Sequence, residues 1–185
     1  MTRARRRQAG LSLLEVCVVI SVAGALLAAF IPAFLHEVRT SKIAEAGEAL
    51  GTLHHGAAAY YAAAHHTPEG SRIYCLPDVV GFWFVTPSVD AHVVDFAADA
   101  TPGAPTWRAL AFAPTRPLRY AYTFTPTASG CGVAPHEDHA TVVVLTAEGD
   151  LDGDGERSHF ERRDGIDAHG DLVPIDVLYV RDRVE

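Results

Sequence analysis

The stretch "RRRQAGLSLLEVCVVISVAGALLAAFIPAFLHEV", residues 5–38, decides the fold, because it joins a basic leader to an apolar run long enough to cross a bilayer. Between Leu11 and Leu35 the only ionisable side chains are Glu15 and Cys17. As a helix this run would be roughly 38 Å long, and the hydrocarbon core of a bilayer is about 30 Å thick. It is also too long for an ordinary secretory signal, whose apolar region has about 7 to 15 residues. The sequence therefore predicts a transmembrane helix with one carboxylate near its start.

The charge distribution predicts which end of that helix faces the cytoplasm. Four arginines lie within the first seven residues, and no comparable basic cluster follows the apolar run. Basic residues favour the cytoplasmic side, so we expect the body on the opposite side of the membrane. The 185-residue chain has a net charge of −8, and without the four arginines the remaining 11 basic and 23 acidic residues leave −12. An acidic body repels phosphate, so no direct nucleic-acid partner is expected.

The apolar run continues without a turn signal into "HEVRTSKIAEAGEALGTLHHGAAAYYAAAHH", where apolar residues recur at steps of three and four. This spacing is typical of an amphipathic helix. One helix is therefore predicted, with a membrane half over residues 11–35 and an amphipathic half over 36–66, ended by Pro68 and Gly70.

Two histidine pairs lie on the expected amphipathic half, at residues 54–55 and 65–66. His54 and His65 would share one helix face but lie roughly 16 Å apart along the axis. One metal ion cannot bridge them, so we interpret this face as solvated or subunit-facing.

The residues around the helix start resemble the signal of type IV pilins and type II secretion pseudopilins. They comprise a basic leader, then Gly10, then "LSLLE" at residues 11–15, then the apolar run. The resemblance implies that a prepilin peptidase cuts after Gly10, removes the leader 1–10 and methylates the new terminus Leu11, where leucine replaces the commoner phenylalanine. The resemblance to this family covers residues 5 to about 64.

The resemblance also assigns assembly roles. Glu15 would face the N-terminal amine of a neighbouring subunit in the filament core, and a buried carboxylate is tolerable when it is paired with a cation. Gly24 and Pro32 bracket a segment similar to one that loses its helical structure in assembled pili. The implied location is the inner membrane, with the globular domain in the periplasm, and then an extracellular pilus or a periplasmic pseudopilus.

Residues 67–185 change to short β-rich pieces separated by Pro, Gly and Asp, which predicts an antiparallel sheet domain. The expected fold class is α+β and pilin-like, with the sheet laid against the back half of the helix. Strands are expected near 81–85 and 91–96, from Trp107, from Leu118, from Ala140, and near the C-terminus. The aromatic residues along these pieces are interpreted as core: Trp83, Phe84, Trp107, Phe112, Tyr120, Tyr122 and Phe124.

Two cysteines, Cys75 and Cys131, lie in this body. If the body is outside the cytoplasm, a disulfide between them is plausible. The alternative is two unpaired thiols.

The acidic loop 150–161, in "GDLDGDGERSHFERRDG", has the residue spacing of a calcium loop. Carboxylates alternate, a glycine permits the turn, and a final glutamate closes the shell. The preceding "ATVVVLTAEG" reads as a strand, so a helix-loop-helix pair is not expected. The alternative is an acidic turn in water, with Glu161 in the next strand. The predicted ligands are Asp150, Asp152, Asp154, Ser158 and Glu161.

No motif for catalysis is present: the sequence has no G-x-S-x-G and no phosphate loop, and "HEDH" at 136–139 lacks the helical spacing of a zinc protease. We therefore expect a structural subunit rather than an enzyme, with no required cofactor and calcium as the one candidate ion. Its expected partners are copies of itself or related pilin subunits, a prepilin peptidase, the membrane, and a pilus or secretion assembly platform. The alternatives are a type II secretion pseudopilin and, from another class, a membrane-anchored calcium-binding module or adhesin that does not polymerise.

Overall fold

A computed structural model shows one long apolar N-terminal helix and a separate antiparallel-sheet region. The helix α1, Leu13–Ala62, begins in one compact unit, Met1–Arg39, and ends in a second, Thr40–Glu185. The residues that the structure describes are 12–77, 81–82, 87–127, 130–132 and 140–182.

The first unit is helical from Leu13 onward, and Pro32 lies inside the helix. Every side chain from Ser12 to Leu35 is exposed. By length and composition this is one helix that could cross a membrane.

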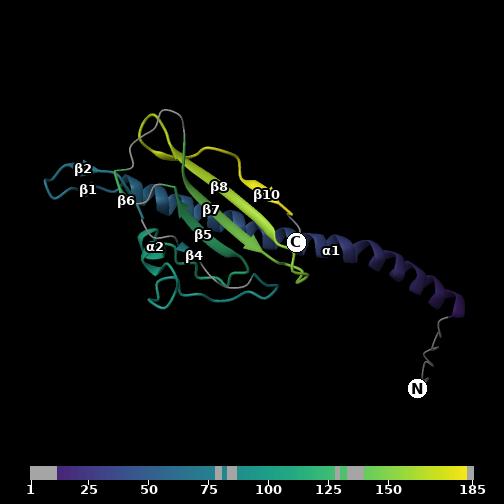
Figure 1. The fold of residues 1–185 in the computed structure, drawn as a ribbon. Coiled ribbons are helices and arrows are strands. Elements are labelled where there is room, and N and C mark those ends of the chain that lie inside the picture. Colours follow the sequence, from purple (N-terminus) through teal and green to yellow (C-terminus); the bar gives the residue numbers. More distant parts are fainter. Residues whose placement is uncertain (1–11, 78–80, 83–86, 128–129, 133–139, 183–185) are drawn as a thin grey trace, which may run out of the picture. The chain divides into compact units, whose positions relative to one another are not determined.

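The second unit is built on a six-stranded antiparallel sheet with the order β10-β8-β7-β5-β4, and β9 also pairs with β8 (Figure 1). Two small antiparallel sheets, β1-β2 and β3-β6, lie outside it. The elements that follow α1 are β1 His65–His66, β2 Arg72–Ile73, β3 Cys75–Leu76, β4 Gly81–Phe82, α2 Ala104–Ala109, β5 Ala121–Pro126, β6 Gly130–Cys131, β7 Thr141–Gly149, β8 Ser158–Ile166, β9 Leu172–Pro174 and β10 Tyr179–Arg181.

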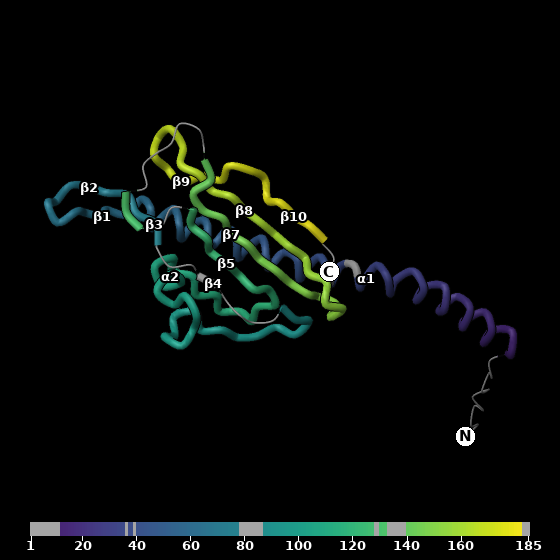
Figure 2. Tube along the Cα trace, viewed as in Figure 1, coloured from purple at the N-terminus to yellow at the C-terminus, as the bar shows by residue number. Residues whose placement is uncertain are grey.

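The second half of α1 covers one face of this sheet, as the Cα trace also shows (Figure 2). Its buried residues recur at steps of three and four, as expected of a helix with one apolar face. Strand residues alternate across the sheet, so one side chain in two points to the helix. The fully buried side chains of this layer include Leu50, Leu53, Ala57, Tyr61, Tyr122, Phe124, Val143, Leu145 and Ala147.

The aromatic residues expected in the core are buried wherever the structure describes them. Phe96, Trp107 and Phe112 form edge-to-face and tilted ring contacts with one another. The predicted positions Trp83 and Phe84 lie outside the described residues.

Two predicted strands are wrong. Residues 91–96 form a single bridge, His92 with Leu118. The segment around Trp107 is the helix α2, because Gly103 precedes it in a left-handed conformation and a proline occupies the first helical turn.

The predicted helix end at residue 66 is also wrong, because α1 ends at Ala62. His65 and His66 pair with Ile73 and Arg72 in a hairpin instead. Nε2 of His65 lies 2.9 Å from the carbonyl oxygen of Tyr60, which also accepts the backbone N–H of Ala63 at 3.2 Å.

Candidate functional site

The start of α1 is a capping box built from Ser12 and Glu15. The Ser12 backbone N–H donates to Oε2 of Glu15 at 2.8 Å, and the Glu15 N–H donates to Oγ of Ser12 at 3.3 Å. This reciprocal pair satisfies two backbone donors that a helix start leaves free. The Ser-x-x-Glu spacing before an apolar run indicates a capping box in the sequence. The interpretation of Glu15 as an assembly contact did not include this capping role.

The other expected residues of the N-terminal signal are placed only in part. Gly10 and Leu11 lie outside the described residues. Gly24 and Pro32 both lie within the continuous helix α1, and no atom lies within 4 Å of a Cβ added at Gly24. In this single chain the segment between them is helical.

Glu45 attaches the second half of α1 to the start of β5. Its Oε1 accepts the backbone N–H of Arg119 at 2.7 Å, the N–H of Tyr120 at 3.4 Å and the hydroxyl of Tyr122 at 3.3 Å. Burial is the main cause that raises the pKa of Tyr120 to about 12, and it raises that of Tyr122 further, so both phenols stay neutral in the core.

His54 makes a second polar contact between α1 and the sheet. Its Nδ1 lies 2.9 Å from Oδ2 of Asp164 on β8, and both side chains are buried. Nε of Arg162 lies 3.6 Å from the other carboxylate oxygen of Asp164. The expectation that His54 lies on a solvated or subunit-facing surface is therefore wrong, because the helix turns this residue toward the sheet.

The hairpin between β7 and β8 brings together the three aspartates of the acidic loop. One carboxylate oxygen from each of Asp150, Asp152 and Asp154 lies within 4.8 Å of the other two. Asp150 already accepts the backbone N–H groups of Gly153 and Gly155, at 2.7 and 3.2 Å. These contacts shape the turn whether or not an ion is bound.

The other two predicted ligands do not join the loop. Ser158 pairs with Gly149 at the closed end of the hairpin, where its hydroxyl donates to the Gly149 carbonyl. Glu161 lies three residues further along β8, roughly 10 Å from that end. Since Ca²⁺ takes six to eight oxygen ligands, three aspartates alone form a partial site. The five predicted ligands are therefore not brought together. Glu161 lies in the next strand, as the alternative interpretation of an acidic turn in water predicts.

Glu161 instead belongs to a row of charged side chains on the outer face of the sheet. Nε of Arg163 lies 2.6 Å from its Oε1, and Nε2 of His159 lies 3.4 Å from its Oε2. Burial raises the pKa of Glu161, but the hydrogen bonds and charges of Arg163 and His159 outweigh burial and lower it. Nδ1 of His159 also lies 3.5 Å from Glu148 on β7, so this histidine lies between two carboxylates.

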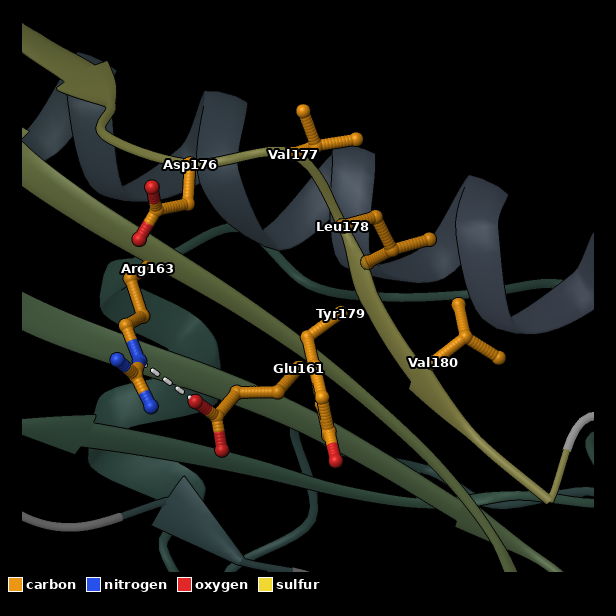
Figure 3. Close-up of a pocket in the computed structure, with 7 residues that line it drawn as sticks. All are labelled: Glu161, Arg163, Asp176, Val177, Leu178, Tyr179 and Val180. Carbon is orange, nitrogen blue, oxygen red and sulfur yellow. Dashed lines mark hydrogen bonds and ion pairs between the residues drawn. The ribbon is translucent and has the colours of Figure 1, made fainter.

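A groove of about 430 Å³ begins at this row of charges and extends along the segment that leads into β10 (Figure 3). The guanidinium of Arg163 points toward Glu161 and away from Asp176, and the ring of Tyr179 lies beside Glu161. Nothing in the sequence pattern indicated this groove, because its walls come from β8 and from a segment fifteen residues later. Its lining residues are Glu161, Arg163, Asp176, Val177, Leu178, Tyr179 and Val180.

Cys75 and Cys131 form a disulfide that joins β3 to β6. They are cross-strand partners in the small sheet, so the bond fastens the segment after α1 to the segment after β5. The pairing that the sequence left open is thus present.

Comparison of the chain with protein-family models, with curated proteins and with solved structures finds no match in any of the three.

Proposed function

We propose that this chain is a structural subunit of a type IV pilus-like filament, cut after Gly10 and assembled through the first half of α1. The observation that carries the proposal is the surface of that half. Every side chain from Leu13 to Leu35 is exposed in its unit, and Glu15 is the only charged one. An apolar surface of this extent needs cover, which a bilayer supplies before assembly and neighbouring helices supply afterwards.

Glu15 supports the same proposal. Among the described residues, its hydrogen-bond partner is Ser12, which carries no charge. A carboxylate in an apolar helix bundle is tolerated when a cation pairs with it. Cleavage after Gly10 creates such a cation, the amino terminus at Leu11 of a neighbouring copy.

A type II secretion pseudopilin is the second candidate. The acidic loop favours it, because major pseudopilins carry a calcium loop near the C-terminus. Asp150, Asp152 and Asp154 are the residues that would hold the ion, which would neutralise three clustered carboxylates. A membrane-anchored calcium-binding module would share this loop and the helix, but it would need no cleavage after Gly10.

Mass spectrometry of the mature chain tests the proposal. We expect a chain that begins at Leu11, with a methylated terminus. An intact Met1, or cleavage beyond residue 30, contradicts the pilin interpretation and favours the anchored module.

Substitution of Glu15 tests its assembly role apart from its capping role. Glu15→Gln keeps an oxygen acceptor for the Ser12 N–H but removes the charge, whereas Glu15→Ala removes both. We expect both variants to be inserted and cleaved but to form few filaments, counted by electron microscopy of sheared material. Glu37→Ala, a carboxylate beyond the apolar segment, is the matched control. Normal assembly of Glu15→Gln would show that the cap, and not the charge, is what assembly requires.

A further inference from the structure

The end of the six-stranded sheet at β10 has the properties of a binding edge. Among the described strands β10 pairs with β8 and is the last in the order, so its other side has no strand beside it. The free N–H and C=O groups of an edge strand are a template for another extended chain. Proteins commonly protect such an edge with charged side chains or a covering element.

The first two residues of β10 carry no charge, and the third, Arg181, is exposed and pairs with Asp182 at 3.2 Å. Leu178 and Val180 are partly buried against the core. The alternate residues Val177 and Tyr179 point the other way and are 91% and 56% exposed. An added strand would find two apolar contacts at the spacing of one face of a strand.

The groove beside this edge carries a net negative charge. Glu161 and Arg163 neutralise each other across 2.6 Å. Asp176 is exposed, and within the described part of the chain its carboxylate has no hydrogen bond or ion pair. The groove therefore has one uncompensated carboxylate beside apolar walls and an aromatic ring (Figure 3).

We propose that the β10 edge and this groove bind an extended segment of a partner protein in which an apolar residue neighbours a lysine or arginine. The segment adds a strand to β10 through backbone hydrogen bonds. Its basic side chain lies along Val177 and Tyr179, with the aliphatic stem on apolar surface and the cation at Asp176. A second copy of the chain is disfavoured as the occupant, because the chain without its leader arginines carries a net charge of −12. The contact does not depend on filament assembly.

A short synthetic peptide in which valine and lysine alternate is the probe. Binding to the full-length protein in detergent micelles is measured by calorimetry, and protection of the β10 amides by hydrogen exchange. We expect saturable binding that slows exchange of residues 179–181, whereas a peptide in which glutamate replaces lysine does not bind.

Matched substitutions separate this site from general attraction to an acidic protein. Asp176→Lys is expected to weaken binding about tenfold or more, and Val177→Ser to weaken it to a lesser degree. Glu69→Lys makes the same change of charge at the exposed β1-β2 turn and is expected to leave binding unchanged.

Three results would overturn the proposal. The first is the absence of saturable binding. The second is equal weakening by Asp176→Lys and Glu69→Lys, which would show non-specific charge attraction. The third is protection of the β10 amides that rises with protein concentration when no peptide is present, since a second copy would then be the occupant.

Discussion

The two halves of α1 belong to one continuous helix but have different surroundings. From Leu13 to Leu35 every side chain is exposed, and the surface is apolar all round. From Thr40 to Ala62 one face is buried against the sheet and the other is open. Helix formation is therefore common to both halves, and what differs is the partner that each apolar surface requires.

The polar residues of the two halves follow the same division. Glu45 and His54 in the second half have partners on β5 and β8 within the same chain. Among the described residues, Glu15 in the first half contacts only Ser12 of the helix cap. The second half has its polar partners within the described part of the chain, whereas in the proposed function a bilayer or other subunits cover the first half.

The largest predicted effect comes from truncating a leucine in each half. Leu53→Ala leaves a cavity in the core and is expected to cost about 2 to 5 kcal/mol of unfolding free energy. Leu27→Ala, at an exposed position of the first half, is expected to change it by less than about 0.5 kcal/mol. Chemical unfolding of the full chain in detergent measures both, and equal losses would contradict the division.

Glycine substitutions sharpen the comparison. A Cβ at Gly56 would lie 2.1 Å from the backbone oxygen of Leu110, so Gly56→Ala is expected to cost up to about 3 kcal/mol. Nothing lies within 4 Å of a Cβ at Gly51 or Gly24. Alanine there should stabilise the helix by up to about 1 kcal/mol. Thermal unfolding distinguishes the three, and a stable Gly56→Ala variant would disprove the close contact.

Two carboxylates on the second half differ in their partners. Glu45→Ala leaves the N–H groups of Arg119 and Tyr120 without their acceptor and is expected to cost about 1 to 2 kcal/mol. Glu48 pairs with Arg116 on the exposed surface, so Glu48→Ala should cost less than about 1 kcal/mol. Denaturant titration of the two variants measures the difference, and equal costs would show that Glu45 does not hold α1 to the sheet.

The smallest predicted effect is that of pH on the free energy of unfolding, because the change begins only above about pH 10. An exposed tyrosine in the unfolded chain has a pKa of about 10, and burial raises the pKa of Tyr120 to about 12. The unfolded chain thus loses its proton first, so stability is complete below about pH 10 and falls as pH rises toward 12. Tyrosinate absorbance and thermal unfolding measured together test this. Ionisation of all tyrosines near pH 10 without unfolding would contradict the burial.

Much of the second unit was predictable from period and composition. "RYAYTF" alternates as a strand with one covered face and contributes to β5. "ATVVVLT" was expected to be a strand and contributes to β7. The strand β8 was harder to predict, because "SHFERRDGI" carries charges on its outer face and hides its apolar pattern. Around Trp107 the apolar run was read as a strand, although the residues 102–105, "PGAP", carry the signal of a helix start.

The sequence by itself determined the apolar run, its single carboxylate and the three clustered aspartates, because each depends on residues close together in the chain. Only the tertiary structure decided which distant groups come together: His54 contacts Asp164, Glu45 contacts the start of β5, and Asp176 lines one groove with Glu161 and Arg163. The physical reason is that strand register and helix rotation set these contacts. A shift of one residue would turn a strand side chain to the opposite face and a helix side chain by about 100°.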